Sequence, residues 1–422
     1  MPTELPVVVI VGGGFGGLAA ARSLKEAPVK VILIDRTNHH LFQPLLYQVA
    51  TAVLGPGQIA SPLRGILSSN DNTTVILGTV TGVDTASKAV IVDNHDRTAV
   101  PVAYDYLILA TGQTHSYFGH DEYEQYAPGL KNVADAVALR NKILTAFEMA
   151  EAEEDPALHK ELLTFVLVGA GPAGVEMASA IAVMVRSTLR RDFRRIDPGS
   201  ARIILIDRGS LPLKTFAPEL SEVVLKRLQR LDVEVMLGKG VDAIDGDGVI
   251  VGGRRIASKT VIWTAGVTPS PAGKWLNAET DRAGKVKVQP DLSVQNCPGV
   301  FVVGDTASLE QDGKPLPGVA QVAIQQGRYA GRLIKRKVGC RPMPAPFRYF
   351  DKGNLAVVGK GYAILQSGRI RMSGYIAWLV WAAIHLQFLA QSSLRVSVLV
   401  QWIWTYWTNQ RGSRLIVKHR VD

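Results

Sequence analysis

Two glycine-rich turns constrain the fold of this chain more than any other feature of its sequence. The first, Gly12-Gly13-Gly14-Phe15-Gly16-Gly17, follows an apolar run and precedes a segment rich in alanine and leucine. The second, Gly169-Ala170-Gly171-Pro172-Ala173-Gly174, lies in the same context. Glycine permits a tight turn, a close approach of backbone to a pyrophosphate, and close packing of helix on strand. Free N–H groups at the helix start would hold the phosphate charge. We therefore expect each turn to bind a dinucleotide.

Strands alternate with helices along most of the 422 residues, a length that suggests two or three domains. Helices are expected over Gly16–Ala27 and Gly174–Arg190. The expected strands are Val7–Gly12, Lys30–Asp35, Tyr104–Ala110, Phe165–Gly169, Arg202–Asp207, Val233–Leu237, Thr260–Thr264 and Val300–Val303. Such alternation is typical of parallel sheets. The sequence predicts an α/β fold with two Rossmann-like, doubly wound dinucleotide-binding domains.

An acidic residue ends the strand that follows each of these helices. Asp35 stands where a carboxylate would accept hydrogen bonds from an adenosine ribose. Asp207 follows its turn at a longer spacing, which the arginine-rich stretch Arg186–Ser200 accounts for. A carboxylate there repels a 2′-phosphate and favours NADH over NADPH, although Arg208 beside it weakens this preference. Two nucleotide sites in one chain suggest electron transfer between a bound flavin and a pyridine nucleotide.

The order of the motifs resembles the two-dinucleotide-domain flavoprotein superfamily, whose architecture is that of glutathione reductase. The motifs are the first turn, Ala110-Thr111-Gly112 and Val302-Val303-Gly304-Asp305. The resemblance implies an FAD-binding domain in two parts, residues 1–115 and 291–340, with an inserted NADH-binding domain over residues 116–290. Residues 341–422 would form a C-terminal membrane-anchoring or dimerisation module. The resemblance makes Asp305 the residue that meets the ribityl or phosphate region of the flavin. Asp305 could equally serve as a helix N-cap, and the two roles are compatible.

Three further strings resemble the type II NADH:quinone oxidoreductases, the single-subunit respiratory NADH dehydrogenases. They are Leu41–Ala50, Ala320–Gln326 and Trp378–Leu389. The resemblance implies noncovalent FAD, NADH as substrate, a membrane quinone as acceptor, and a homodimer. No proton pumping is expected, because the sequence holds no bundle of spans with buried ionisable residues.

The resemblance also assigns site residues. Val322 and Ala323 should approach the flavin through their backbone, Val80 should contact adenine, and Gly266 should approach NAD. Lys360 matches a position near flavin and quinone, and the alternative is that it is an ordinary surface lysine. For Val80 and Gly266 the alternative is that each is an ordinary strand end. The expected cofactor-binding residues are Gly12, Gly14, Phe15, Gly16, Gly17, Asp35, Arg36, Gln43, Val80, Ala110, Thr111, Gly112, Gly169, Gly171, Pro172, Ala173, Gly174, Asp207, Gly266, Asp305, Val322, Ala323 and Lys360.

Three side chains are expected to act in catalysis. Gln321 and Gln325 lie four residues apart and would share one helix face. Their amides suit the carbonyls of a quinone in an apolar slot, whereas a capped helix with solvated glutamines is the alternative. Glu176 follows the second turn, where acids also favour the first turn of a helix. The resemblance gives Glu176 a role in positioning nicotinamide and in proton movement.

The two cysteines, Cys297 and Cys340, exclude several classes of protein. They are too few for a disulfide-stapled secreted scaffold or a thiolate metal cluster, and they form no recognisable redox pair. No metal is expected. The apolar run Val7–Val11 follows Glu4 rather than a cationic region, so it is interpreted as a strand and not a signal peptide.

The C-terminal part differs in charge and composition from the rest. Residues 328–422 carry 16 lysines and arginines against two acids, while residues 1–327 are weakly acidic. The uncharged run Met372–Leu394 makes a poor membrane span, and five of the seven tryptophans fall between Trp378 and Trp407. We expect two helices lying in one leaflet, with Arg395 and Arg411 on anionic lipid. The expected location is peripheral, on the cytoplasmic face of the inner membrane.

Alternatives to this interpretation remain open. The tail could be a buried dimer helix, alone or together with lipid contact, whereas nucleic-acid binding has no supporting signature. The enzyme could be a soluble NAD(P)H-dependent flavoprotein that reduces another acceptor, such as a ferredoxin-type protein. A non-enzymatic, flavin-binding redox sensor would bind FAD but turn over NADH slowly.

Overall fold

The computed structural model describes residues 4–417 and divides the chain into two compact units. The first unit contains the residues up to Leu41, Ser61–Thr114 and Val267–Lys352. The second contains Phe42–Ala60, His115–Gly266 and the residues from Gly353 onward. The domain boundaries inferred from the resemblance stay a prediction.

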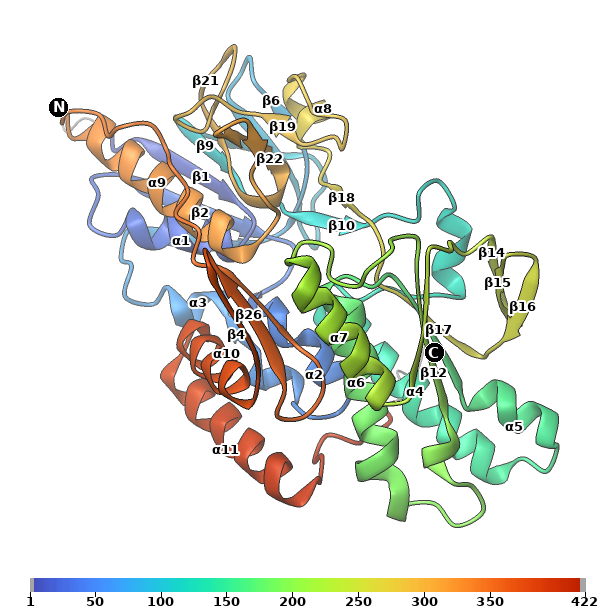
Figure 1. Cartoon of the computed structure of the whole chain (residues 1–422). Helices are drawn as coiled ribbons and strands as arrows, with labels where there is room; N and C mark the ends of the chain where they lie inside the picture. The colour runs from blue at the N-terminus through green and yellow to red at the C-terminus, as the bar shows by residue number, and fades with distance from the viewer. Residues whose placement is uncertain (1–3, 418–422) are drawn as a thin grey trace. The chain divides into compact units, whose positions relative to one another are not determined.

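A six-stranded sheet forms the centre of the first unit (Figure 1). Its order is β20 (Ser293–Val294), β21 (Cys297–Val302), β9 (Tyr106–Leu109), β1 (Val7–Val11), β2 (Lys30–Asp35) and β5 (Thr73–Leu77). All neighbours pair in parallel except β20, which is antiparallel to β21. This arrangement confirms the predicted doubly wound α/β class.

Each face of this sheet has its own core. Val8 and Ile10 pack with α1 (Phe15–Ser23) and α9 (Ala320–Val338), whereas Val9 and Val11 belong to a core on the other face. This alternation follows from the two-residue period of a strand. The second core is covered by the antiparallel strands β6 (Thr79–Asp84), β7 (Ala89–Asp93) and β8 (Val100–Ala103).

Helices α1 and α9 pack so closely that there is no room for side chains where their backbones meet. A Cβ atom on Gly327 would collide with the carbonyl oxygen of Gly16, and one on Gly331 would lie 2.8 Å from the carbonyl oxygen of Ala20. Glycine is therefore required on α9 by its neighbour rather than by its own dihedral angles.

The second unit repeats the parallel arrangement with four strands. Their order is β13 (Val233–Leu237), β12 (Arg202–Asp207), β11 (Thr164–Val168) and β17 (Thr260–Trp263). Its larger helices are α4 (Val133–Ala152), α6 (Pro172–Val183) and α7 (Pro218–Arg230). The antiparallel strands β14 (Ala243–Asp245), β15 (Gly248–Val251) and β16 (Arg254–Ala257) share a core with this sheet.

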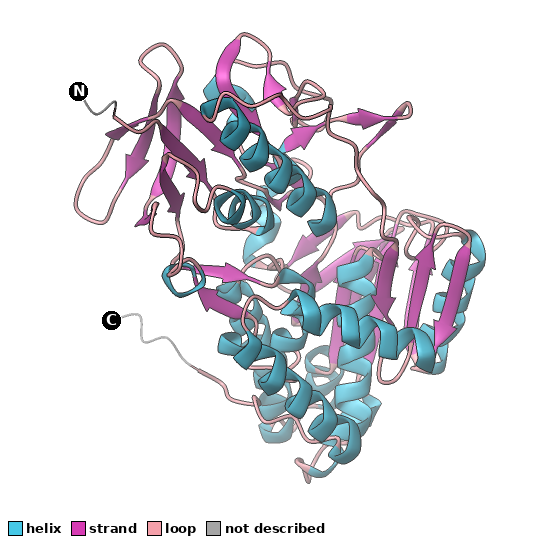
Figure 2. Cartoon of the chain, turned by 90° about the vertical axis from the view of Figure 1, so that its left-hand side faces the viewer, coloured by secondary structure: helices cyan, strands magenta, loops and turns pink. Residues whose placement is uncertain are grey.

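The C-terminal residues of the second unit form a sheet and two helices, seen from another side in Figure 2. They are β25 (Asn354–Val357), β26 (Ala363–Ser367), β27 (Ile370–Gly374), α10 (Tyr375–Phe388) and α11 (Ser392–Thr408). The buried helix α2 (Leu46–Ala50) packs on α4 and α6. Shorter elements of the chain are β3 (His39–Leu41), β4 (Ala60–Pro62), α3 (Leu63–Ile66), β10 (Gln113–His115), α5 (Pro156–Leu162), β18 (Val267–Pro269), α8 (Ala272–Leu276), β19 (Val286–Lys287), β22 (Ala307–Ser308), β23 (Glu310–Gln311) and β24 (Lys314–Pro315).

The predicted helix over Gly174–Arg190 is wrong at its C-terminal end. Regular helix stops at Val183 and continues as a π-helical turn, Met184–Thr188, and a 3-10 turn, Leu189–Arg191. The hydroxyl group of Ser187 donates to the carbonyl oxygen of Val183 at 2.5 Å. Such back-bonding by serine competes with regular helical hydrogen bonds.

The uncharged run Met372–Leu394 covers the end of a strand, a whole helix and the start of another helix. It begins in β27, continues as α10, and breaks between Phe388 and Ser392. Among residues 4–417, no helix combines the length and the apolar character needed to cross a membrane.

Candidate functional site

The first glycine-rich turn is built as an anion cradle. Gly12 has a φ of +101°, which favours glycine, and Gly14 caps α1 with open space where a Cβ would stand. The backbone N–H of Gly13 donates to Oδ2 of Asp35 at 2.5 Å. No side chain caps the start of α1, so its first N–H groups are available to an anionic ligand.

The second turn repeats this construction. Gly169 has a φ of +109°, and Gly171 caps α6 with open space in place of its Cβ. The N–H of Ala170 donates to Oδ2 of Asp207 at 2.7 Å, and Oδ1 accepts from the N–H of Gly209 at 2.6 Å. The sequence correctly located both carboxylates at the turns, but it missed that each one holds the backbone of its turn.

Ribose binding by these carboxylates stays a prediction. Oδ1 of Asp35 already accepts from the N–H and the hydroxyl group of Thr37, both at 2.7 Å. A carboxylate has about four acceptor sites, so each aspartate retains capacity for a ribose hydroxyl. Arg36 beside Asp35 is exposed.

A network in the first unit brings together the strand ends that the motifs predicted. The hydroxyl group of Thr306 donates to the carbonyl oxygen of Gly112 at 3.0 Å. The amide of Gln113 donates to Oδ2 of Asp305 at 2.7 Å, which fixes that carboxylate. Ala110 and Thr111 lie directly before Gly112, and Val322 and Ala323 are buried in the first turns of α9.

Two buried side chains of the first unit were missed by sequence reasoning. Gln326 is 1% exposed, and its Oε1 accepts from the N–H of Gly304 at 2.7 Å. Nδ1 of His40 lies 2.9 Å from the carbonyl oxygen of Gly13, and burial lowers the pKa of this histidine. The pair His39-His40 and the third glutamine of α9 were visible in the sequence, but nothing there indicated burial.

The two predicted catalytic glutamines have different surroundings. Nε2 of Gln325 donates to the carbonyl oxygen of Phe350 at 2.9 Å, while its Oε1 accepts from the N–H of Phe350 at 3.0 Å. Gln325 thus fastens the segment that follows α9. Within residues 4–417, the amide of Gln321 forms no side-chain hydrogen bond.

Glu176 lines a cavity of about 100 Å³ in the second unit. Burial raises the pKa of its carboxyl group to about 8, which the N–H of Val357, 3.4 Å from Oε1, opposes only in part. The carboxyl group is therefore largely protonated at neutral pH. The cavity is also lined by Tyr47, Gln48, Val53, Ser179, Ala180, Val183, Ser187, Thr188, Val357, Gly359, Lys360, Trp378, Trp381, Trp402, Thr405, Tyr406, Asn409 and Arg411.

A chain of hydrogen bonds crosses the wall of this cavity. Nε1 of Trp402 donates to Oε1 of Gln48 at 2.7 Å, and Nε2 of Gln48 donates to the hydroxyl group of Tyr47 at 3.1 Å. Burial raises the pKa of Tyr47, and Glu176 adds to the shift. Lys360 donates to Oδ1 of Asn409 at 2.7 Å, and burial lowers its pKa.

Arg411 corrects one prediction. We expected it on the lipid surface, but it is 4% exposed and donates to the carbonyl oxygens of Thr51 at 2.7 Å and Ala180 at 3.1 Å. Burial lowers its pKa to about 9. Among the described residues, Nε of Arg411 and Nε1 of Trp381 are buried without an acceptor, and both side chains line the Glu176 cavity.

Cofactor binding by Gln43, Val80 and Gly266 stays a prediction. Nε2 of Gln43 donates to the carbonyl oxygen of Lys131 at 3.0 Å, and Val80 is half-buried in β6. Gly266 has a φ of +75°, and a Cβ there would lie 2.5 Å from the ring of Phe118. Among residues 4–417, no cluster of three potential metal ligands occurs, and Cys297 and Cys340 are both free thiols.

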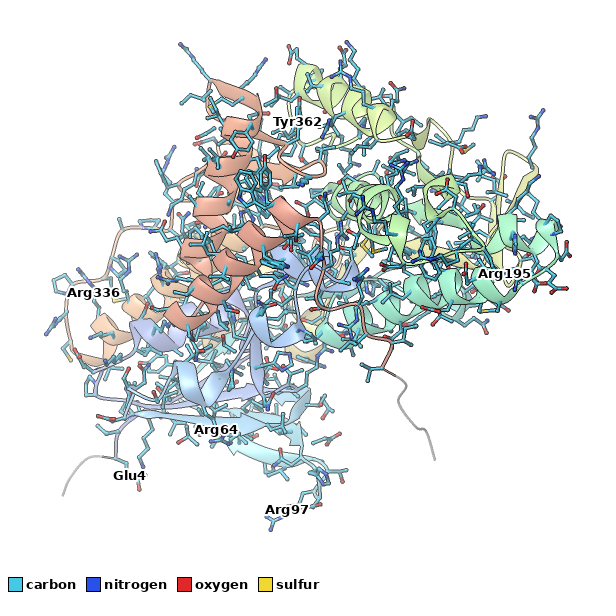
Figure 3. All side chains as sticks on the ribbon, turned by 90° about the horizontal axis from the view of Figure 1, so that it is seen from below. Glu4, Arg64, Arg97, Arg195, Arg336 and Tyr362 are labelled. Atoms are coloured by element: carbon cyan, nitrogen blue, oxygen red, sulfur yellow. The ribbon has the colours of Figure 1, made fainter. Side chains whose placement is uncertain are left out.

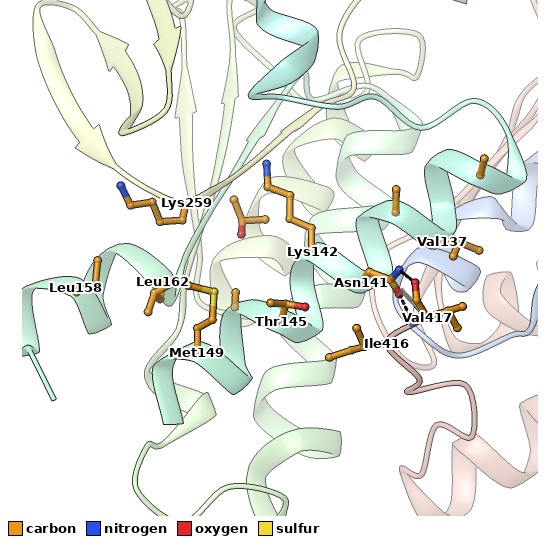
Figure 4. A pocket seen from close by; sticks show the side chains of 14 residues that line it. Val137, Asn141, Lys142, Thr145, Met149, Leu158, Leu162, Lys259, Ile416 and Val417 are labelled. Carbon is orange, nitrogen blue, oxygen red and sulfur yellow. Dashed lines mark hydrogen bonds between the residues drawn. The ribbon is translucent and has the colours of Figure 1, made fainter. Parts of the chain in front are cut away.

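A larger cavity of about 740 Å³ runs along α4 in the second unit (Figure 4). Met149, Leu162 and Ile416 give it an apolar lining. The C-terminal segment is fastened beside it, because the amide of Asn141 donates to the carbonyl oxygen of Val417 at 2.7 Å and accepts from its N–H at 3.2 Å.

Comparison with known proteins places these turns in a family. Residues 6–327 match the family described as pyridine nucleotide-disulphide oxidoreductase. Type II NADH:quinone oxidoreductase Ndh of Mycobacterium tuberculosis is 45% identical over 98% of this chain and 91% of the relative. This chain belongs to the type II NADH:quinone oxidoreductases. Type II NADH:quinone oxidoreductase NdhA of the same organism is 43% identical over 98% of this chain and 90% of the relative.

A solved structure supports the same fold for this type II NADH:quinone oxidoreductase. The NADH complex of NDH2 from Plasmodium falciparum has a TM-score of 0.88 and covers 98% of this chain and 100% of its own, at 18% identity. The predicted fold class and family are therefore confirmed.

The first turn fits the pyrophosphate of FAD, the cofactor of this flavoprotein family. The open space at Gly14, the uncapped start of α1 and the positive φ of Gly12 together form a cradle that a side chain would fill.

Proposed function

We propose that this chain transfers two electrons from NADH, through noncovalently bound FAD, to a membrane quinone, without proton pumping. The observation that carries this proposal is the pair of cradled turns, each held by a carboxylate, in a chain so similar to type II NADH:quinone oxidoreductases. Bound FAD would supply the two-electron redox chemistry. The protein supplies binding, orientation and proton handling.

The cofactor-binding roles follow the two turns. In the first unit, Gly12 and Gly14–Gly17 hold the FAD pyrophosphate, Asp35 accepts from its ribose, and Asp305 meets the ribityl or phosphate region. In the second unit, Gly169–Gly174 hold NADH. Asp207 favours NADH over NADPH, because a carboxylate fixed at this turn repels a 2′-phosphate.

Glu176 is the proposed proton-handling group. Burial keeps its carboxyl group protonated near neutral pH, so it can donate a proton during quinone reduction and become ionised above about pH 8. The two N–H donors of Trp381 and Arg411 that lack acceptors favour a ligand with an acceptor oxygen in this cavity.

Gln321 is the proposed amide ligand of a quinone carbonyl, because both the Nε2 and the Oε1 of Gln325 are already hydrogen-bonded to Phe350. We assign Gln325 to positioning of the segment after α9. This division of roles differs from the shared role that the resemblance implied.

The proposed membrane contact lies on α10 and α11. Large apolar side chains are exposed there, among them Ile376, Val400, Ile403, Trp404 and Trp407, the last at 79%. Tryptophan favours the headgroup level of a bilayer. We propose peripheral attachment to the cytoplasmic face of the inner membrane, and a homodimer that covers part of this surface is compatible with it.

Steady-state assays with different acceptors test the proposed function. Purified protein in detergent should oxidise NADH rapidly with a short-chain quinone and slowly with ferredoxin, and it should prefer NADH to NADPH. Faster turnover with ferredoxin would support the soluble-reductase alternative. Bound FAD with slow turnover by every acceptor would support a redox sensor.

A further inference from the structure

The segment after α6 concentrates positive charge at the surface of the second unit. Residues 186–195, called the arginine segment below, contain five arginines and one acid, Asp192. The π-helical turn Met184–Thr188 and the 3-10 turn Leu189–Arg191 build this segment. Arg195 lies at the edge of the unit in Figure 3, in a view that also shows α10 and α11.

The arginine segment contacts the C-terminal end of α11. The hydroxyl group of Thr188 donates to the carbonyl oxygen of Asn409, the residue after α11, at 3.0 Å. Asp192 forms an ion pair with Arg414. The same region of the chain carries the exposed rings of Trp404 and Trp407. An apolar surface and a cationic surface therefore adjoin within one unit.

Most of this charge is not neutralised by the protein. Arg190, Arg191, Arg194 and Arg195 are all exposed. The carboxylate of Glu151 accepts from the backbone N–H groups of Arg194, Arg195 and Ile196, and it also interacts with the charge of Arg195. Within the described residues, the only ion pair of these four arginines joins Arg195 to Glu154 at 3.7 Å, and both side chains are largely exposed.

Two nearby acids form ion pairs with cations other than these four arginines. Asp192 pairs with Arg414, and Asp232 pairs with Arg186 at 3.1 Å. Nη1 of Arg194 donates to the carbonyl oxygen of Arg191 at 2.7 Å, which fixes one edge of its guanidinium group. The surface thus presents exposed arginines on a segment that is hydrogen-bonded to the residue after α11.

We infer that the arginine segment binds the phosphate headgroups of anionic lipids where α11 meets a bilayer. Guanidinium groups match phosphate oxygens in two-point hydrogen bonds. This inference rests on the proposed peripheral attachment through α10 and α11. It replaces Arg411, which is buried, by residues outside the helices, and it leaves the exposed Arg395 of α11 as a predicted lipid contact.

Vesicle co-sedimentation tests the inference. The purified full chain should bind phosphatidylcholine vesicles that contain phosphatidylglycerol more tightly than pure phosphatidylcholine vesicles, and added salt should remove the difference. A variant with Arg190, Arg191, Arg194 and Arg195 all changed to Gln should lose about 600-fold in partition to the anionic vesicles, from about fivefold for each arginine. Its binding to neutral vesicles should not change.

The matched control changes four exposed cations elsewhere in the second unit, Lys226, Arg230, Lys239 and Arg254, to Gln. It should keep the preference for anionic vesicles. Equal anionic-lipid binding by both variants, or no lipid-charge preference in the unaltered protein, would overturn the inference.

NADH oxidation with a short-chain quinone separates this inference from the proposed function. Both variants should retain this activity and their flavin content. If neither vesicle type binds the unaltered protein while the activity persists, the proposed attachment fails together with this inference but the proposed reaction stands.

Discussion

At the scale of single residues, the chemistry depends on groups whose neighbours alter their ordinary behaviour. Glu176 is the clearest, because its pKa of about 8 lies well above the usual 4.5. Between pH 4.5 and about pH 8, Glu176 keeps a proton in the folded chain that it has lost in the unfolded chain. Its stability contribution is therefore largest at acid pH and falls as the pH rises toward 8, by about 1.4 kcal/mol for each pH unit.

Glu176→Gln should remove this dependence. Relative to the unaltered protein, the midpoint of its thermal unfolding should rise steadily from pH 5 to pH 8, and its quinone turnover should fall by about a hundredfold. Glu222→Gln, an exposed glutamate on α7, is the control and should match the unaltered protein. Unchanged NADH binding together with unchanged quinone turnover would remove Glu176 from the site.

Gly171→Ala tests the second cradle. Its Cβ would meet no protein atom, so the chain should fold normally, but it would occupy the space through which a pyrophosphate approaches. The KM for NADH should rise about tenfold or more, while the flavin content stays the same. Gly57→Ala, which also adds a Cβ in open space but lies outside both turns, should change neither. An unchanged KM in Gly171→Ala would show that the nucleotide lies elsewhere.

The sequence predicted the residues of both turns, because glycine, a helix start and an acidic strand end are local signals. It could not predict Arg411, whose partners are Thr51 and Ala180, far away in the chain. A lone arginine after an aromatic run has the same local signature whether it is buried or on lipid. Gln326 and His40 were missed for the same reason.

At the scale of elements, α9 both packs against α1 and carries residues of the candidate site. Its Gly327 and Gly331 lie against α1. Gln326 accepts a hydrogen bond from the N–H of Gly304 after strand β21, and Gln325 holds the segment after the helix. The strands were predicted well, since short apolar runs have a clear local pattern. The end of α6 was not, because a side-chain-to-backbone hydrogen bond of Ser187 marks it.

Two glutamine variants on α9 should separate structure from chemistry. Gln326→Ala leaves the N–H of Gly304 without its acceptor, so the free energy of unfolding should fall by about 1–3 kcal/mol. Gln321→Ala breaks no internal hydrogen bond and should unfold like the original protein, but its KM for quinone should rise. Thermal unfolding and quinone kinetics measured on both variants check this. The opposite pattern would exchange the two roles.

At the scale of the whole molecule, each unit carries one cradled turn, and the second also carries the exposed apolar face of α10 and α11. Composition and charge predicted two helices in the C-terminal part, and the structure confirms them. The sequence could not predict which of the cations are exposed, because their exposure depends on tertiary packing.

Changing Trp404 and Trp407 together to Ser should weaken binding to neutral vesicles by about tenfold or more, because two exposed rings would no longer enter the headgroup region. NADH oxidation with a short-chain quinone should persist. The control, Phe118→Ser, removes an exposed ring from elsewhere in the second unit. Equal vesicle binding by all three proteins would place the lipid contact outside α11.

An anaerobic titration followed by absorbance tests the central claim most directly. The isolated protein should show the absorption bands of oxidised flavin, lose them on addition of about one equivalent of NADH, and recover them when a short-chain quinone is added. A colourless protein, or a flavin that NADH bleaches but quinone fails to restore, would contradict the account.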